Sequence, residues 1–538
     1  MEAKSDSALT PSALGAICAA CVLAGAGVWA YADYRKRDKR YPPRGGPPMT
    51  EVIRTLQNQK GLKKLTIFQE ASQCLQDGQF GRTKYGATFR LALPFTSPFF
   101  TTSDFRLARL VLQGDQTRQE FDKGYHMTFL NYFDRSVSSL LTHKTANPHR
   151  ERARKALAPG FSTNNLLQTW PYLREGLIEE FRSLSALARE GRPLVCRERL
   201  LQFALRVLAR SAFGVEFTMD GTEDETNVNG LEYIRCQEVA AAERVKEFSM
   251  PMRPYFFWSA QVREARAAEK TLQRIAQKTL DLHTRARDSA EGAEGSSRKS
   301  LMQLIAAHAY PSDVARLADI NIITFAGHDT TGFSFCFLLM ELARRPEARA
   351  KLQAEIDSVM PAAPLDSPLG SPDPSDPTSA QHGDPKLVSA LANLEYLNCC
   401  IKEGTRLWPV AAAGGSREVA EDFEWEGMLL PKGSTIQPHF YSIFRERWID
   451  RPHEFLPERW LPSNPQLPLL KEMYIPFSVG KRSCIGQNMA LFQLRLLAAY
   501  FLHYFDFELQ GEPSFEFFIT LKPVDLLLSV SERRQWGV

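Results

Sequence analysis

A single cysteine occupies a constrained loop in the segment PFSVGKRSCIGQNMA, residues 476–490. Cys484 lies between Gly480 and Gly486, and glycine suits backbone conformations that other residues resist. A helix-like apolar run begins at Asn488, so its N-terminal amides are expected to face the sulfur. This position favours the thiolate over the thiol.

A thiolate in this loop could attack a substrate or bind a metal. A nucleophilic cysteine usually works with a nearby base. The adjacent residues include Lys481 and Arg482 but no histidine. The structural alternative is a small buried thiol that only packs against its neighbours.

A second polar group interrupts a long apolar helix predicted over residues 312–344. The stretch Ala326-Gly-His-Asp-Thr-Thr331 places an acid and hydroxyls where an ordinary core helix would bury apolar groups. Asp329 and Thr330 are neighbours, so their side chains point about 100° apart. Gly327 is expected to leave room beside the backbone for a ligand or water.

The cysteine loop resembles the haem-binding loop of the cytochrome P-450 family. The residues that match are Phe477, Gly480, Arg482, Cys484 and Gly486. The resemblance implies haem b (iron protoporphyrin IX) as cofactor, with Cys484 as its axial thiolate ligand. Three other stretches match the family in the right order, so the resemblance covers nearly the whole chain.

The polar helix stretch matches the family pattern A-G-x-D-T-T at every position. In the family, this pattern forms the distal face of the haem pocket. The resemblance therefore implies that Ala326 and Gly327 contact the cofactor and that Asp329 and Thr330 deliver protons during dioxygen activation. His328 occupies the variable position and is interpreted as pocket lining or packing.

Two further stretches match a structural element of the family. Glu403 and Arg406 are three residues apart on one helical face, where they can pair. Arg459, in the stretch FLPERW, matches the arginine that joins this pair in the family. The resemblance implies that the triad holds the core and takes no part in catalysis.

Haem propionates need cations, and arginine is well suited to carboxylates. The resemblance implies this role for Arg482, Arg417 and Arg154. Arg154 matches the basic residue of the family's W-x-x-x-R pattern, but Arg150 occupies the tryptophan position. A solvated basic surface is the alternative interpretation of that stretch.

The composition of the 538-residue chain supports a large core, with 44% hydrophobic residues and 34 phenylalanines. Its 66 basic and 62 acidic residues leave a formal charge of only +4, which gives no reason to expect nucleic acid as a partner. The nine cysteines lack the spacing of a disulfide framework and are interpreted as reduced.

The amino-terminal region is predicted to anchor the chain in a membrane. After a short tail at 1–10, residues 11–32 form an uncharged apolar span long enough to cross a bilayer, and a basic cluster follows it. This charge distribution keeps the rest of the chain in the cytosol. A cleaved signal peptide is the alternative. Residues 33–48 are basic and proline-rich and are interpreted as a stiff hinge.

Residues 49–538 are interpreted as one haem-thiolate catalytic domain, mainly α-helical with small β-sheets, in the cytochrome P-450 fold. The stretch 361–385 contains seven prolines with many serines and aspartates. Such a composition predicts a disordered insertion in a surface loop.

The resemblance and the predicted anchor together imply a single-pass monooxygenase of the endoplasmic reticulum membrane, where its anchor contacts membrane lipid. It would oxidise a small lipophilic molecule with dioxygen and electrons from an NADPH-dependent flavin reductase or a small haem protein. No flavin or nicotinamide motif is apparent in the chain itself. The alternatives are an oxygen-independent isomerase or lyase of the same family and a non-catalytic haem- or sterol-binding membrane protein.

Overall fold

The computed structural model describes residues 87–91, 98–113, 121–122, 137–145, 147–249, 253–289, 300–361, 365, 385–517 and 519–535. The predicted tail, anchor and hinge lie outside these residues, as does nearly all of the insertion at 361–385. The described helices are α5 (Phe105–Gln113), α6 (Pro148–Leu157), α7 (Thr163–Leu167), α8 (Trp170–Glu190), α9 (Cys196–Leu208), α10 (Gly230–Ser249), α11 (Ala260–Ser289), α12 (Leu301–Ala307), α13 (Asp313–Ala343), α14 (Pro346–Asp357), α15 (Pro385–Asn393), α16 (Glu395–Leu407), α17 (Phe440–Ile443), α18 (Leu467–Met473) and α19 (Gln487–Tyr504).

The described strands are short. They are β1 (Thr88–Leu91), β2 (Phe99–Thr102), β3 (Phe121–Asp122), β4 (Leu194–Val195), β5 (Glu216–Thr218), β6 (Asn227–Asn229), β7 (Arg417–Val419), β8 (Phe423–Trp425), β9 (Met428–Leu430), β10 (Thr435–Pro438), β11 (Phe505–Gln510), β12 (Phe515–Phe517), β13 (Leu521–Pro523) and β14 (Leu527–Glu532). The mainly helical fold with small sheets is therefore confirmed.

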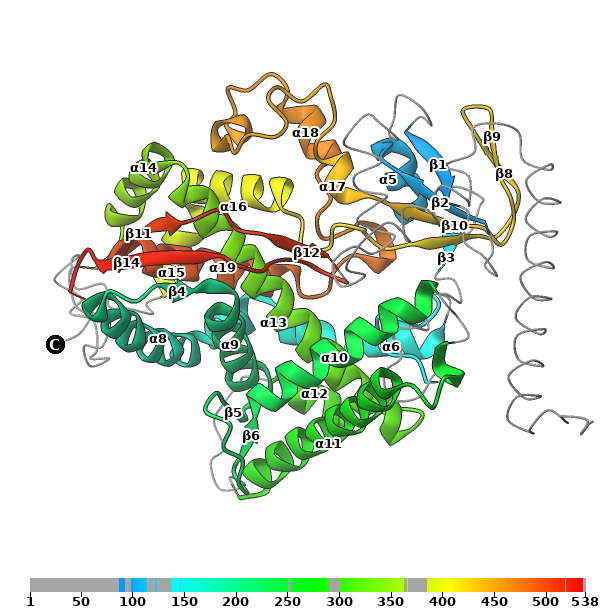
Figure 1. Ribbon diagram of the computed structural model, residues 1–538, viewed down its shortest axis with the longest axis horizontal. Helices are drawn as coiled ribbons and strands as arrows, with labels where there is room; N and C mark the ends of the chain where they lie inside the picture. The colour runs from blue at the N-terminus through cyan, green and yellow to red at the C-terminus, as the bar shows by residue number, and fades with distance from the viewer. Residues whose placement is uncertain are drawn as a thin grey trace, which may run out of the picture.

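Helix α13 crosses the centre of the helical region (Figure 1). The Ser312 hydroxyl caps its first turn by accepting a hydrogen bond from the Ala315 amide, and Arg344 ends it. This is the long helix that the sequence predicts. Within the described part of the chain it is also the one helix apolar and long enough to span a membrane, but 72% of its apolar window is buried in the fold. It is the core helix, packed against α9, α11, α16 and α19.

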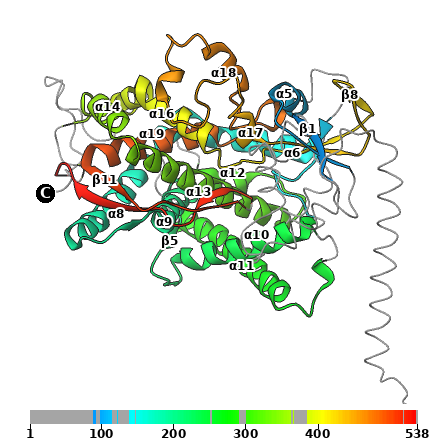
Figure 2. The ribbon, with the colours of Figure 1, turned by 45° about the horizontal axis from the view of Figure 1, so that its top comes forward.

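The largest sheet joins distant parts of the chain in the order β1-β2-β10-β7-β3. Strands β2 and β10 pair in parallel, with Phe99 opposite Thr435. A second sheet, in the order β11-β14-β4, places the end of the described chain beside the start of α9. Figures 1 and 2 both show these two sheets at opposite sides of the molecule, with the helices between them.

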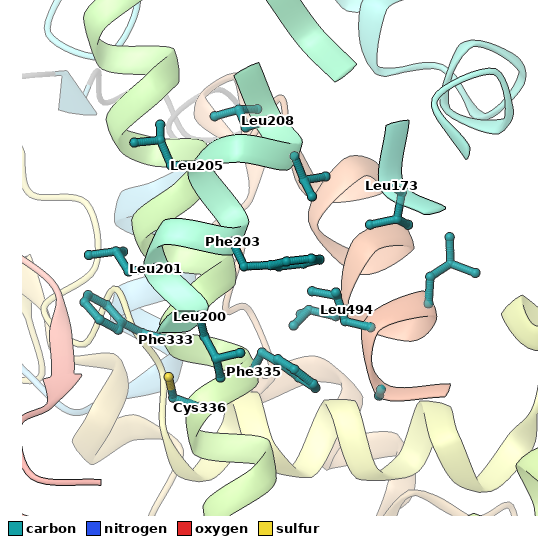
Figure 3. Close-up of a cluster of buried hydrophobic side chains, with 14 of the residues drawn as sticks. Leu173, Leu200, Leu201, Phe203, Leu205, Leu208, Phe333, Phe335, Cys336 and Leu494 are labelled. Atoms are coloured by element: carbon teal, nitrogen blue, oxygen red, sulfur yellow. The ribbon is translucent and has the colours of Figure 1, made fainter. Parts of the chain in front are cut away.

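The apolar core lies where α9 and α13 run side by side, close to α19. Figure 3 shows Phe203 pointing from α9 toward Leu494 of α19. Helices α9 and α13 approach each other closely because α13 has glycines, which carry no side chain, at the contact. A Cβ on Gly332 would lie 3.2 Å from the Leu200 carbonyl oxygen, and one on Gly327 would lie 2.8 Å from the Leu208 side chain.

Candidate active site

The loop that carries Cys484 has a backbone conformation that only glycine adopts easily. Gly480 has φ +76° and begins a short 3₁₀ turn, Gly480–Arg482. A Cβ at this position would also lie 3.0 Å from backbone atoms of Leu112 and Gln113, at the end of α5. The Cys484 amide closes the loop by donating to the Phe477 carbonyl at 2.8 Å. Both constraints fix where the sulfur lies.

Cys484 differs from the other described cysteines in its surroundings. It is exposed, whereas the others are buried: Cys196, Cys236, Cys336, Cys399 and Cys400. Protein still surrounds the thiol on several sides, and this desolvation raises its pKa, although the Gly486 amide and Arg154 lower it. The expectation that the position by itself favours the thiolate is therefore wrong for the free thiol, because desolvation outweighs the amide and the arginine. Helix α19 begins directly after Gly486. The thiol is therefore accessible while being positioned by backbone on both sides.

Helix α6 braces this loop with two arginines. Arg154 donates to the Ser483 carbonyl at 2.9 Å, and Arg150 donates to the Lys481 carbonyl at 2.5 Å. Arg150 occupies the position that the family pattern gives to tryptophan. In this chain an aromatic ring is therefore replaced by a second guanidinium group that binds the loop backbone. Sequence reasoning missed this role because the two partners are 331 positions apart.

The two other predicted propionate arginines are also held by backbone carbonyls. Arg482 donates to the carbonyls of Leu141 and His143, both at 2.8 Å. Arg417 is fully buried on β7 and donates to the Ser416 carbonyl at 3.0 Å. Arg154, Arg417 and Arg482 are thus fixed cations, and two of the three are joined to the cysteine loop.

The polar stretch of α13 presents its groups to different sides. Ala326 is exposed and Thr330 half-buried, and the Thr330 hydroxyl donates to the Ala326 carbonyl at 2.7 Å. Asp329 is buried and accepts a hydrogen bond from the Thr520 hydroxyl at 2.6 Å. The two neighbours therefore diverge as predicted. Thr520 was not anticipated, because it lies 191 positions away and in no motif.

The expectation that Gly327 leaves room for a ligand is wrong. A side chain at this position would meet Leu208 of α9, so the glycine serves the close contact between two helices. His328 is buried and donates from Nδ1 to the Thr324 carbonyl at 2.6 Å, and burial lowers its pKa to about 4. It is a neutral histidine fixed within the helix, consistent with packing.

Asp329 has a carboxyl group suited to proton exchange near neutral pH. Burial raises its pKa to about 6, although the Thr520 hydroxyl and the charge of Lys522 both lower it. A carboxyl group with this pKa exists in both protonation states under ordinary conditions. This is the property that a general acid needs.

Glu403, Arg406 and Arg459 form the predicted ion-paired group. Glu403 accepts from Arg406 and from Arg459 at 2.8 Å each, and all three residues are buried. Arg406 also donates to the carbonyls of Phe444 and Pro452, residues of the irregular chain that precedes the cysteine loop. These contacts hold backbone that has little regular structure of its own.

The comparisons with known proteins identify a family to which most of the chain is similar. A family model described as cytochrome P450 matches residues 61–530. Cytochrome P450 3A5 of Homo sapiens is 27% identical over 379 residues, which cover 66% of this chain and 68% of that protein. The putative cytochrome P450 CYP13A7 of Caenorhabditis elegans is 24% identical over 464 residues, covering 76% and 83%. The crystal structure of a cytochrome P450 (CYP102L1) matches with a TM-score of 0.71 over 87% of this chain and 99% of that one, at 20% identity.

The fold and the match together define a haem-thiolate oxidoreductase. The chain belongs to the cytochrome P450 family, because the family model covers most of its length. Its cofactor is haem, held by a cysteine thiolate, and its activity is that of a monooxygenase in general.

Proposed function

We propose that the chain is a membrane-bound monooxygenase that oxidises a small lipophilic substrate, with Cys484 as the haem ligand. The observation that carries this proposal is that Cys484 alone among the described cysteines is exposed, in a loop that glycines and two α6 arginines fix in place. The donor set fits haem, since it joins one accessible thiol to cations that can bind two carboxylates. The porphyrin ring would contact three residues of the loop, Phe477, Gly480 and Gly486. It would also contact Ala326 of α13.

Haem supplies the dioxygen chemistry when bound, and a thiolate ligand favours cleavage of the O–O bond. The chain's own part is to position the ligand and to move protons. Asp329 is buried with a pKa of about 6, so it can release a proton and take one up again. The Thr330 hydroxyl can donate and accept at the side of α13 where Ala326 is exposed.

Substituting Thr330 and Asp329 should separate these two roles. We expect Thr330→Ala to consume NADPH while releasing more peroxide and less oxidised product, because one hydrogen-bonding hydroxyl is lost. Asp329→Asn keeps the shape but cannot relay protons, so we expect turnover to fall about 100-fold. NADPH, peroxide and product are measured together, and haem content serves as the control. Unchanged coupling and rate in both variants would favour the oxygen-independent alternative.

Electrons are proposed to come from an NADPH-dependent flavin reductase or a small haem protein. The surface beside the cysteine loop has more basic than acidic groups: Arg152 and Lys155 of α6 and Lys481 of the loop are all exposed, and the acid on α6, Glu151, pairs with Lys155 at 3.1 Å. Such a surface suits an acidic partner. Sustained NADPH consumption with a reductase would also separate this function from that of a non-catalytic binding protein.

The endoplasmic reticulum membrane is the proposed location. Besides the predicted anchor, the turn between α10 and α11 exposes three large aromatic side chains, Tyr255 at 67%, Phe257 at 66% and Trp258 at 64%. Arg263 of α11 donates to the Trp258 carbonyl at 2.6 Å, which places a cation beside this aromatic group. Aromatic and basic side chains together suit the membrane–water interface, which also favours a lipophilic substrate.

Truncation and surface variants should separate the two membrane contacts. We expect removal of residues 1–40 to weaken membrane association and leave haem binding intact. In this truncated chain, Phe257→Ser with Trp258→Ser should reduce co-sedimentation with phosphatidylcholine vesicles further. Leu469→Ser is the matched control, because Leu469 is an exposed apolar residue (39%) on α18. Equal binding by all truncated variants would contradict a role for the turn.

The orientation is tested with the full-length chain in sealed microsomes. Added protease should reach the catalytic domain, because the basic cluster after the anchor keeps that domain in the cytosol. Full protection of the domain would overturn this orientation.

A further inference from the structure

Asp319 is a buried acid of α13 that the proposed chemistry does not use. It lies in the first half of the helix and is 2% exposed. Its Oδ1 accepts a hydrogen bond from the Leu140 amide at 2.6 Å, and its Oδ2 accepts one from the Tyr310 hydroxyl at 3.1 Å. Both donors come from outside α13, so this acid ties the helix to two other segments of the chain.

Leu140 belongs to a short turn, residues 139–143, which closes on itself. The amides of Thr142 and His143 both donate to the Ser139 carbonyl, at 3.0 Å and 2.9 Å. The Thr142 hydroxyl in turn accepts from the Ser139 amide at 2.9 Å. Because these bonds fix the turn internally, a bond that holds the Leu140 amide also holds the rest of the turn against α13.

The same 139–143 turn binds the cysteine loop. Nη2 of Arg482 donates to the carbonyls of Leu141 and His143, at 2.8 Å each. Arg482 lies two positions before Cys484 in the loop. Hydrogen bonds therefore connect Asp319 to the turn and the turn to Arg482, which is a predicted cation for a haem propionate.

We propose that Asp319 is a positioning residue for the haem site and acts through the 139–143 turn, which holds Arg482 beside Cys484. The inference rests on the proposed function, because it takes Cys484 as the haem ligand and Arg482 as a cation of the same site. The part of Asp319 is to supply the acceptor for the Leu140 amide. When this acceptor is lost, the turn and Arg482 are held less firmly, so bound haem should leave faster.

The protonation state of Asp319 gives the attachment of the turn a pH dependence. Burial raises the pKa of Asp319 to about 7, although the bonds from Leu140 and Tyr310 lower it. When the turn detaches and water reaches the carboxyl group, its pKa should return toward about 4. The attached state therefore binds the proton more tightly. Attachment should weaken as pH rises toward 7 and stay constant above that value.

Other titratable groups surround this contact. Three histidine rings form a row beside Tyr310, with the ring centroids of His143 and His149 5.5 Å apart and those of His149 and His308 5.4 Å apart. Burial lowers the pKa of all three histidines, so their protonation weakens the fold as pH falls. Asp319→Asn retains these groups, so comparison with that variant isolates the carboxyl group. The cations beside the histidines are Arg150, Arg152, Arg316 and Arg482.

The test measures loss of haem instead of turnover. Ferric holoenzyme is mixed with apomyoglobin, and haem transfer is followed by absorbance. Asp319→Ala removes the acceptor of two hydrogen bonds, so transfer at pH 6 should be roughly tenfold faster. Hydrogen exchange of a peptide that covers residues 137–145 should also increase in this variant.

Asp319→Asn tests whether an acceptor is what the turn needs. Its amide oxygen can still accept from the Leu140 amide, so haem transfer and hydrogen exchange at pH 6 should match the wild type. The ratio of the wild-type transfer rate to that of Asp319→Asn should then rise by up to roughly tenfold between pH 6 and pH 8, because only the wild type has a carboxyl group to ionise.

Two further variants test the proposed connection. Tyr310→Phe removes a bond that lowers the pKa of Asp319, so the midpoint of the pH profile should move upward. Arg482→Gln removes the group through which Asp319 is proposed to act. In the Arg482→Gln protein, Asp319→Ala should therefore cause no further increase in haem transfer.

Thr324→Val is the matched control, because Thr324 is a buried threonine of α13 whose hydroxyl donates to the Ile320 carbonyl of the same helix at 2.7 Å. Its haem transfer should match the wild type. Additive effects of Asp319→Ala and Arg482→Gln would overturn the inference and leave the proposed function standing. So would a rate ratio that stays flat between pH 6 and pH 8, which decides the case even where Asp319→Ala fails to fold. The proposed function fails separately, if Cys484→Ser retains haem-thiolate spectra.

Discussion

The Cys484→Ser variant is expected to lose the red-shifted carbon-monoxide Soret band of the reduced protein together with all monooxygenase turnover. Serine keeps the size of the side chain and the loop geometry, but its hydroxyl does not supply a thiolate to the iron. The loop should still form, because Gly480 and the bond from the Cys484 amide to the Phe477 carbonyl do not depend on the sulfur.

Cys236→Ser is the matched control for this substitution. Cys236 is buried on α10 and is 8% exposed, the largest exposed fraction among the described buried cysteines. We expect this variant to keep the band and the activity. A Cys484→Ser protein that retained the band would show that another group binds the iron, and the proposed function would lose its main support.

Glu403→Gln is expected to destabilise the fold more than any surface substitution. The Glu403 carboxylate compensates two buried guanidinium groups and also accepts from the Trp460 indole at 2.9 Å and the Leu456 amide at 3.0 Å. Glutamine removes the negative charge. Its side-chain NH₂ group would also face the guanidinium, indole and amide groups, which are all donors. Breaking a buried ion pair in this way costs about 3–5 kcal/mol, to be measured by urea unfolding with haem retention as a second readout.

The pKa of Glu403 predicts in which direction the free energy of unfolding changes with pH. Burial by itself would raise the pKa of Glu403, but Arg406 and Arg459 outweigh it and the pKa is lowered. A lowered pKa contributes stability that is present above the unfolded value and is lost as pH falls through the folded value. Wild-type protein should therefore lose this stability in acid, and Glu403→Gln should lack that part of the loss.

Glu458→Gln is the control for the triad. The Glu458 carboxylate also pairs with a cation, Lys351, at 3.0 Å, but its side chain is 49% exposed. An exposed pair contributes at most about 1 kcal/mol, so this variant should unfold almost like the wild type. Equal destabilisation by the two substitutions would show that the triad has no special structural role.

The sequence predicts those features whose causes are local. Cys484 and its glycines are separated by a few residues, and the pairing of Glu403 with Arg406 follows from helical spacing. The central helix is recognisable because its N-cap, Ser312, and the Pro346 beyond its end are adjacent to its apolar run. In each of these features the physical cause lies within the segment itself.

Other features depend on residues that only the fold brings together. No pattern in the sequence pairs Thr520 with Asp329, since the two positions lie on different elements and only one of them belongs to a motif. The interpretation of Gly327 shows the opposite error. Its place in the motif predicted space for a ligand, whereas the glycine allows close contact with Leu208 of α9. Tertiary packing therefore decides which small or polar residue has a functional partner.

The bracing of the cysteine loop by α6, together with the proposed role of Cys484 as the haem ligand, limits when the protein can acquire its cofactor during synthesis. Arg154 and its partner Ser483 are 329 positions apart. At ribosomal rates of about 5–20 residues per second, α6 leaves the ribosome roughly 15–65 s before the loop exists. Throughout this time its arginines have no loop to hold, and the nascent chain cannot retain haem through Cys484. Cofactor loading is therefore confined to the last stage of translation or to the released chain, and nascent chains stalled before the loop should carry no haem.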